Sequence, residues 1–352
     1  MKRILIVSAF PPVIGGVPIG AQRLYDTLIK SGYSVVKLNT HFSNEKYNRS
    51  KILKYSKYLL LPIFILLHKR FDVIHFRVCG IISKLYISLW RFLFSRKTQF
   101  IISIHGQVSH VIESRFGYYA LSKFDKIICV KPGDSINLPP SLRKKTVEIS
   151  GYIPPIISND IVDDNPDLLN SFLLRDSFKL LINGKIICDE KFFDLYGFKD
   201  SIILLEQLRN IGKNVDLIIV VIGFTSNKKC SDYVKYLKSY INDKGLDEHV
   251  CWVENVNMEL WPIFKKVQVL LRPTKSDGDA LSIRESLYLK TPVIASNVVP
   301  RPLNTIVYDF NSETDLFNKT LTLVDNYQEC ISKLGNNNVN FAEQIIEEYE
   351  KW

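Results

Sequence analysis

The sequence predicts an α/β protein of two domains, each built on a parallel sheet. Continuous apolar runs recur along the chain, which is typical of parallel strands buried on both faces. Helical segments lie between these runs, and a Pro-, Asn- and Asp-rich stretch at 156–176 separates two such series. At 352 residues the chain is long enough for two hydrophobic cores.

The charge is distributed unevenly between the two halves. Residues 1–155 hold 24 Lys and Arg against 7 Asp and Glu, whereas the remainder holds 22 against 29, within a net charge of +10. A basic half predicts an anionic partner, either a membrane surface or nucleic acid. Because its basic residues alternate with apolar runs and form no recognised nucleic-acid module, a membrane surface is favoured over nucleic acid.

The cysteines and the N-terminus indicate a cytoplasmic protein. The six cysteines occur singly with no CxxC pair, so neither a zinc site nor a disulfide framework is expected. The first apolar run is short and has no small-residue cleavage site after it, unlike a secretory signal peptide.

The first domain is predicted at 1–155. Gly15, Gly16 and Gly20 lie in the loop after its first strand, where glycines let the backbone approach a phosphate; a tight turn without a ligand is the alternative. No acid ends the second strand, which disfavours a nicotinamide dinucleotide. The predicted elements are a helix at 21–30 and strands at 3–9, 33–38, 71–78, 100–104, 126–130 and 146–150.

His105 stands at the carboxyl end of the strand at 100–104, and Gly106 follows it. The carboxyl ends of parallel strands line the crevice in which such sheets bind ligands. His105 is therefore a candidate ligand-binding residue, with a purely structural histidine as the alternative.

Two basic, aromatic-rich stretches lie at 51–70 and 84–97. The apolar core of the first, 58–67, spans about ten residues, fewer than the roughly 20 that cross a bilayer. Both are predicted as amphipathic helices in a membrane interface. The alternative is a pair of domain helices on the sheet with snorkelling lysines.

The second domain is predicted at 177–337, and a helix at 338–352 follows it. Its key stretch, Leu270–Ser296, is expected to form a buried strand, an acidic loop, a helix and a second buried strand. The backbone N–H groups at the start of that helix, near Ala280, could bind an anion. Further elements are strands at 178–183, 215–223, 250–253 and 305–308, and helices at 199–210, 231–244, 258–266, 315–332 and 340–352.

The chain resembles the retaining glycosyltransferases of the GT-B fold, family four type, also known as glycosyl transferases group 1. The likeness rests on PPVIGGV, DVIH, IHG, NGK and, most specifically, DGDALSIRE followed by LYLKTPVIAS. In that family, Glu-x7-Glu precedes a helix and a Pro-Val-Ile-Ala strand; here Asp277 takes the first Glu position and Glu285 the second. The variant loop resembles that of transferases from bacterial capsule and O-antigen gene clusters.

The resemblance implies two Rossmann-like domains facing a cleft, with the C-terminal helix packed on the N-terminal domain. It also implies a role for each matched residue. Glu285 binds the donor ribose, and Asp277, with backbone N–H groups at Gly278, Asp279, Ala280 and Leu281, holds the donor sugar. Lys185, after Gly184, binds phosphate together with Lys191 or Lys199, of which Lys191 is preferred. Gly15 and Gly16 approach the diphosphate, and His105 contacts the sugar.

Two positions depart from the family pattern. Arg301 lies where the family has a glycine-rich turn, so it either contacts phosphate or has a structural role. The string Asp277-Gly278-Asp279 matches the metal-binding Asp-x-Asp of the other glycosyltransferase fold, but its place after a second-domain strand favours sugar contact. No metal or other cofactor is therefore expected.

The implied function is a hexosyltransferase-type enzyme (EC 2.4) that uses a UDP- or GDP-sugar. Its expected acceptor is a lipid-linked glycan or polysaccharide in bacterial capsule or O-antigen synthesis, at the inner face of the plasma membrane. The alternatives are a catalytically silent GT-B scaffold that partners another transferase, and a sugar-nucleotide epimerase.

Overall fold

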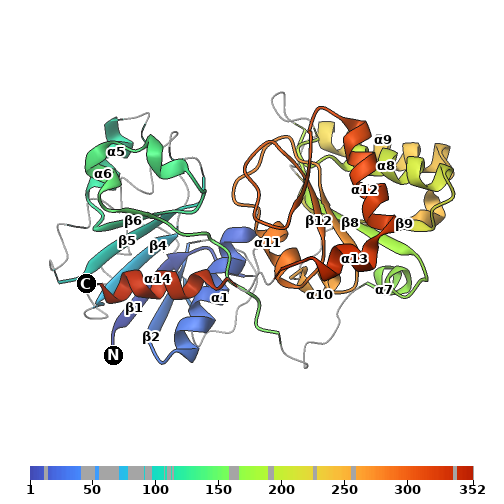
Figure 1. The fold of residues 1–352 in the computed structure, drawn as a ribbon. Helices are drawn as coiled ribbons and strands as arrows, with labels where there is room; N and C mark the ends of the chain where they lie inside the picture. Colours follow the sequence, from blue (N-terminus) through green and yellow to red (C-terminus); the bar gives the residue numbers. More distant parts are fainter. Residues whose placement is uncertain are drawn as a thin grey trace. The chain divides into compact units, whose positions relative to one another are not determined.

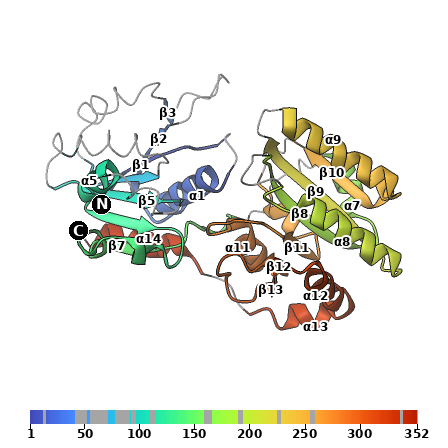
Figure 2. The ribbon, with the colours of Figure 1, turned by 90° about the horizontal axis from the view of Figure 1, so that it is seen from above.

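The chain folds into two compact units, Met1–Ile156 with Val339–Trp352, and Ile157–Asn338. Figures 1 and 2 show both units in two views. Among the residues that are described, no helix is long and apolar enough to cross a membrane. The structure, a computed structural model, describes residues 1–11, 15–40, 52–54, 71–77, 91, 97–106, 108, 112, 115–157, 166–188, 194–224, 228–254, 259–335 and 339–351.

The first unit is built on a parallel sheet of seven strands in the order β3-β2-β1-β4-β5-β6-β7. The strands are β1 Arg3–Ser8, β2 Ser34–Asn39, β3 Ile52–Lys54, β4 Val73–Arg77, β5 Gln99–Ile104, β6 Lys126–Cys129 and β7 Thr146–Glu148. The helices are α1 Gly16–Lys30, α5 Arg115–Ser122, the 3-10 helix η3 Asp134–Asn137, α6 Pro140–Arg143 and α14 Phe341–Glu350.

Helices cover both faces of this sheet. Ile4 and Ile6 of β1 pack with residues of α1 and α14, whereas Leu5 and Val7 pack with residues of α5 and α6. Successive side chains of a strand point to opposite faces, so a strand covered on both faces requires a continuous apolar run. In Figure 1, α5 lies above the strands of the sheet and α14 below them.

The C-terminal helix α14 packs on the first unit, which confirms the prediction from the family resemblance. Tyr349 of α14 is buried, and its hydroxyl lies 2.6 Å from Nδ1 of His75 in β4. The other ring nitrogen of His75 lies 2.7 Å from the hydroxyl of Ser103 in β5. An ion pair of 2.6 Å between Lys126 and Glu348 adds a second link from the sheet to α14.

The second unit is built on a parallel sheet of six strands in the order β10-β9-β8-β11-β12-β13. The strands are β8 Phe178–Ile186, β9 Val215–Phe224, β10 Val250–Glu254, β11 Val269–Arg272, β12 Val293–Ser296 and β13 Ile306–Tyr308. The helices are α7 Asp167–Leu173, α8 Phe198–Asn210, α9 Lys228–Asp243, the 3-10 helix η4 Asp247–His249, α10 Trp261–Phe264, α11 Leu281–Tyr288, α12 Glu313–Asp325 and α13 Tyr327–Ser332.

Both faces of the second sheet are also covered by helices. Leu180 and Ile182 of β8 pack with residues of α8, α9 and α12, whereas Leu181 packs with residues of α7, α10 and α11. The two parallel α/β sheets confirm the predicted fold class.

The predicted first loop and the basic stretch at 51–70 need correction. Helix α1 begins at Gly16 rather than at residue 21, so Gly20 lies inside the helix. Pro18 lies in the first turn, where the missing N–H of a proline costs no hydrogen bond. Residues 52–54 form strand β3, so the stretch at 51–70 does not begin as a helix. Its remainder, and nearly all of 84–97, lie outside the described residues.

The second half of the predicted linker at 156–176 is the helix α7. Leu169 and Phe172, one helical turn apart, are buried in the core of the second unit. The predicted helix at 258–266 is shortened to α10, and the predicted helix at 315–332 is divided into α12 and α13 by Asn326.

Candidate functional site

Three neighbouring strands of the second unit, β8, β11 and β12, run parallel and end at one edge of its sheet. Arg272 is the last residue of β11, and a polar loop leads from it to the N-terminus of α11. Ala280, the N-cap of α11, has an extended backbone and no side chain that could cap the helix. The first-turn N–H groups of α11 therefore offer a place for an anionic group.

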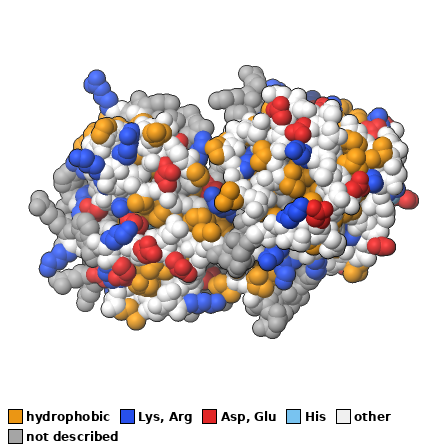
Figure 3. Space-filling view, viewed as in Figure 1, with side chains coloured by type: hydrophobic (Ala, Val, Ile, Leu, Met, Phe, Trp, Pro, Cys, Tyr) orange, Lys and Arg blue, Asp and Glu red, His pale blue; other side chains and the backbone are white. Residues whose placement is uncertain are grey.

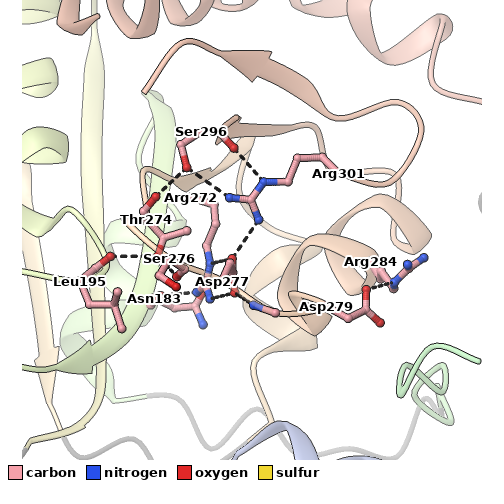
Figure 4. Close-up of polar contacts among 11 residues, drawn as sticks. Asn183, Leu195, Arg272, Thr274, Ser276, Asp277, Asp279, Arg284, Ser296 and Arg301 are labelled. Carbon is pink, nitrogen blue, oxygen red and sulfur yellow. Dashed lines mark hydrogen bonds and ion pairs between the residues drawn. The ribbon is translucent and has the colours of Figure 1, made fainter. Parts of the chain in front are cut away.

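Asp277 lies in this loop between two arginines (Figure 4). Its carboxylate accepts hydrogen bonds from Nε and Nη2 of Arg272 at 3.0 and 3.2 Å, and from Nη1 of Arg301 at 2.9 Å. The Asp277 and Arg301 side chains are 8% and 2% exposed. Asp277 thus joins the end of β11 to the loop after β12.

The two guanidinium groups determine the charge state of this cluster. Burial acts to raise the pKa of the Asp277 carboxyl, but Arg272 and Arg301 outweigh it and hold that pKa below its ordinary value. Burial also acts to lower the pKa of Arg272, and the Asp277 carboxylate more than offsets it. Asp277 is therefore ionised at neutral pH, and the cluster carries a net charge of +1.

Arg301 has a structural environment. Its Nε donates to the carbonyl oxygen of Ser296 at 2.8 Å and its Nη2 to the Ser296 hydroxyl at 3.2 Å, while Nη1 binds Asp277. All three nitrogens are thus used within the fold, which favours the structural alternative over a phosphate contact. Arg272 was not predicted as a site residue, because it belongs to an apolar run that was interpreted only as a buried strand. Its position at the carboxyl end of that strand is the one sequence feature that could have indicated a site residue.

The other acids of the stretch lie at the start of α11. Asp279 forms a 2.6 Å ion pair with Arg284, and its side chain is buried. Gly278 is exposed, and its N–H donates to Asp277. Glu285 is half-buried, one turn into the helix after Leu281.

Lys185 and Gly184 lie at the end of β8. Lys185 is exposed, whereas Gly184 is buried beneath the ring of Tyr196; a Cβ added to Gly184 would lie 2.5 Å from Cγ of that ring. The guanidinium carbon of Arg272 lies 4.6 Å from the centre of the same ring. The cluster around Asp277 is therefore continuous with the end of β8.

The second predicted lysine is only partly placed. Lys191 lies outside the described residues. The ammonium group of Lys199 lies 5.3 Å from the ring centre of Tyr236 in α9, so this lysine packs against α9.

The predicted residues of the first unit also follow strand ends. Gly15 and Gly16 begin α1 after β1, and His105 follows β5. A Cβ on Gly151 would lie 3.3 Å from Cε1 of His105, so the histidine ring rests against the backbone at Gly151. Within the described part of the chain, no group of three or more His, Cys, Asp or Glu residues could hold a metal ion.

Comparison with solved structures identifies the fold. Anabaena HepE in complex with UDP and glucose has a TM-score of 0.72 and 12% identity, covering 100% of both chains. The catalytic domain of Arabidopsis thaliana starch synthase IV, bound to ADP and acarbose, has a TM-score of 0.73 and 10% identity, and the match covers 100% of this chain and 99% of that chain. The lipopolysaccharide outer core galactosyltransferase WaaB has a TM-score of 0.61 and 16% identity, and the match covers 100% of both chains.

The class of fold is therefore GT-B. Residues 185–352, which include the loop, α11 and the arginine cluster, match the family model of Glycosyl transferases group 1. This match covers just under half of the chain and indicates a glycosyltransferase (EC 2.4). A search of curated proteins finds no match.

Proposed function

We propose that the protein is a retaining glycosyltransferase that transfers a sugar from a UDP- or GDP-sugar to a lipid-linked glycan or polysaccharide. The observation that carries this proposal is the convergence of Lys185, Glu285 and the N-terminus of α11 at one sheet edge, within the residues that match the family model. The proposed pathway is bacterial capsule or O-antigen synthesis, which the resemblance of the loop to that of transferases from such gene clusters supports.

Each group has a role suited to its chemistry. Glu285 binds the ribose hydroxyls, and Lys185 balances the charge of the diphosphate. The backbone N–H groups of Gly278 to Leu281 hold the donor sugar. Because Asp277 is bonded to two arginines, its proposed contribution to sugar binding includes fixing the position of this backbone.

The reaction follows from these roles. When the nucleoside diphosphate departs, negative charge grows on its β-phosphate and positive charge on the sugar. Fixed cations and a helix N-terminus stabilise the phosphate charge. In this proposal His105 contacts the sugar near the reacting carbon, and Gly15 and Gly16 approach the diphosphate. The leaving phosphate can take the acceptor proton on the same face, so no side-chain nucleophile and no metal are required.

Donor binding and transfer test the proposal. UDP and GDP are titrated calorimetrically, and nucleotide-sugars are screened for hydrolysis and transfer. Glu285→Ala and Lys185→Ala are expected to lower transfer at least about a hundredfold with the fold intact, because each removes a charged contact to the donor. Lys235→Ala, on the exposed face of α9, is the matched control. Full activity of purified Glu285→Ala would refute the site.

The alternatives predict other results. A silent scaffold need bind neither UDP nor GDP. An epimerase converts its nucleotide-sugar without an acceptor, so product analysis with and without acceptor separates it from a transferase.

An exposed aromatic surface on the first unit supports a peripheral membrane location. Phe116 of α5 and Ile136 of η3 are each 69% exposed, and Tyr118 and Tyr119 are also exposed. Figure 3 shows hydrophobic and basic side chains next to one another over the part of the first unit where α5 lies in Figure 1. Aromatic side chains together with cations are typical of surfaces that enter an anionic membrane interface.

Liposome co-sedimentation tests this location. We expect binding to anionic vesicles that weakens with salt and falls in the double variant Phe116→Ser, Ile136→Ser. The control is Leu303→Ser, which removes a still more exposed apolar side chain from the second unit. No binding of the wild type at low salt would remove the membrane proposal.

A further inference from the structure

Arg77 is a buried cation at the carboxyl end of β4 in the first unit. Arg77 is only 1% exposed, and its side chain is among the largest fully buried ones in the described part of the protein. Its carbonyl oxygen accepts a 3.3 Å hydrogen bond from the hydroxyl of Ser8, the residue paired with it on β1. The side chain therefore lies at the sheet edge that also carries His105.

One edge of the Arg77 guanidinium has no hydrogen-bond partner among the described residues. The atoms concerned, Nε and Nη2, are both buried. Burial lowers the pKa of Arg77 to about 10, so the group remains charged at neutral pH. A buried cation without hydrogen bonds is unfavourable, and such groups are rare in folded proteins unless a ligand or water satisfies them.

The Nε–Nη2 edge of Arg272 shows which kind of group this edge of an arginine is suited to bind. In the second unit, Nε and Nη2 of Arg272 hold the two carboxylate oxygens of Asp277. This side-on pair of N–H groups matches the oxygens of a carboxylate or a phosphate. Arg77 presents the same pair of donors, and no described carboxylate fills it.

The titratable groups next to Arg77 are neutral, so they do not balance its positive charge. His75 on the same strand is held neutral by burial and by the Arg77 charge, which together lower its pKa well below the ordinary value. The Tyr349 hydroxyl remains protonated, because burial raises its pKa. A Cβ on Gly20 would lie 3.0 Å from Nη2 of Arg77, so the glycine permits the guanidinium to lie against α1.

His105 is linked to the same place. The Cβ position of Gly20 is 3.2 Å from the carbonyl oxygen of Gly151, and the Cβ position of Gly151 is 3.3 Å from Cε1 of the His105 ring. Arg77, the last residue of β4, and His105, which follows the neighbouring strand β5, thus each lie against one of two glycines whose backbones approach each other.

We propose that the Nε–Nη2 edge of Arg77 binds a phosphate oxyanion of a substrate. This inference rests on the proposed function for the source of the anion, which is either the donor diphosphate or the diphosphate of a lipid-linked acceptor. Away from bulk water, the charge-assisted hydrogen bonds are stronger than at the surface.

The test compares Arg77→Met with wild type. Binding of inorganic pyrophosphate is measured by calorimetry and by the shift in melting temperature. We expect Arg77→Met to fold with an equal or higher melting temperature, because an unsatisfied buried cation is removed, and to bind pyrophosphate at least about tenfold more weakly. Arg77→Lys keeps the charge but not the paired donors and is expected to fall between the two. Arg115→Met, which removes an exposed cation of the same unit, is the control.

Two further titrations identify the source of the phosphate. Loss of UDP and GDP affinity in Arg77→Met assigns the donor, and loss of geranyl diphosphate affinity assigns the acceptor. No pyrophosphate binding by wild type, unchanged affinity in Arg77→Met, or a variant that melts lower or fails to fold would each overturn the proposal and make Arg77 a structural cation. Pyrophosphate binding needs no transfer activity, so failure of the proposed function would be seen separately, as wild type that binds neither UDP nor GDP.

Discussion

The arginine cluster predicts that Asp277→Asn severely destabilises the second unit. The substitution preserves size but removes the carboxylate that binds Arg272 at 3.0 and 3.2 Å and Arg301 at 2.9 Å. Two buried guanidinium groups would then face each other without an anion. Removing one partner of a buried ion pair costs about 3–5 kcal/mol, a large part of the roughly 5–15 kcal/mol that stabilises a typical protein.

The assay is urea unfolding followed by circular dichroism at pH 7, with the transition of the second unit compared between variants. Asp325→Asn is the control, because it breaks an exposed 2.6 Å pair with Lys213, and such pairs contribute under about 1 kcal/mol. A loss below 1 kcal/mol in Asp277→Asn would refute the view that the carboxylate holds the two arginines together.

The same cluster predicts a pH dependence. The folded pKa of Asp277 lies below its unfolded value of about 3.9, so its stabilisation is full above that value and is lost as pH falls through the folded pKa. Asp277→Asn should therefore lose less stability on acidification than wild type does.

Three other predictions concern buried groups elsewhere. Burial and the nearby Asp194 carboxylate raise the pKa of Asp200 to about 6, above the unfolded value, so stability should decline as pH rises from about 4 to above 6. Asp200→Asn should raise the free energy of unfolding at pH 7 by up to about 3 kcal/mol and remove this decline. Tyr349→Phe leaves His75 without its 2.6 Å partner and should cost about 1–3 kcal/mol in urea unfolding. Gly184→Ala places a methyl group 2.5 Å from the partly buried ring of Tyr196 and should lower the melting temperature by several degrees.

Matched variants decide these three predictions. The stability of Asp200→Asn is measured across pH, and an unchanged profile would contradict the raised pKa. The control for Tyr349→Phe is Tyr33→Phe, which removes an exposed hydrogen bond to Glu350 and should change the free energy of unfolding by less than about 0.5 kcal/mol. If Tyr349→Phe lost no more stability than Tyr33→Phe, burial would not strengthen the contribution of the Tyr349–His75 hydrogen bond. Gly278→Ala meets no atom within 4 Å, so it should leave the melting temperature nearly unchanged.

The buried strands and their ends could be predicted because their chemistry is local. Continuous apolar runs indicated the strands of both sheets except β3, and residues that follow or end them, such as His105 and Lys185, fall at the carboxyl ends as expected. Helix α7 was obscured by the polar composition around it, although Leu169 and Phe172 have helical spacing. The start of α1 was misplaced because its glycines indicated a loop.

The arginine cluster could not be predicted because it depends on tertiary contacts. Arg272 and Arg301 are 29 positions apart in sequence, and only the pairing of β11 with β12 brings both to Asp277. The family pattern directed attention to Asp277 as a sugar contact, whereas its immediate partners are side chains of this chain. The empty edge of Arg77 likewise has no sequence signal, because it depends on burial.

The return of α14 to the first sheet imposes an order on folding during synthesis. Residues 157–338 can complete their core once they have left the ribosome, but the first unit lacks Ala342, Ile345 and Tyr349 until the later segment emerges. The first unit therefore cannot complete its core while the second unit is being synthesised, and one face of its sheet stays partly uncovered during that time. A fragment that stops at residue 156 would keep that face open permanently and should aggregate, whereas joining residues 339–351 to it by a flexible linker should restore solubility.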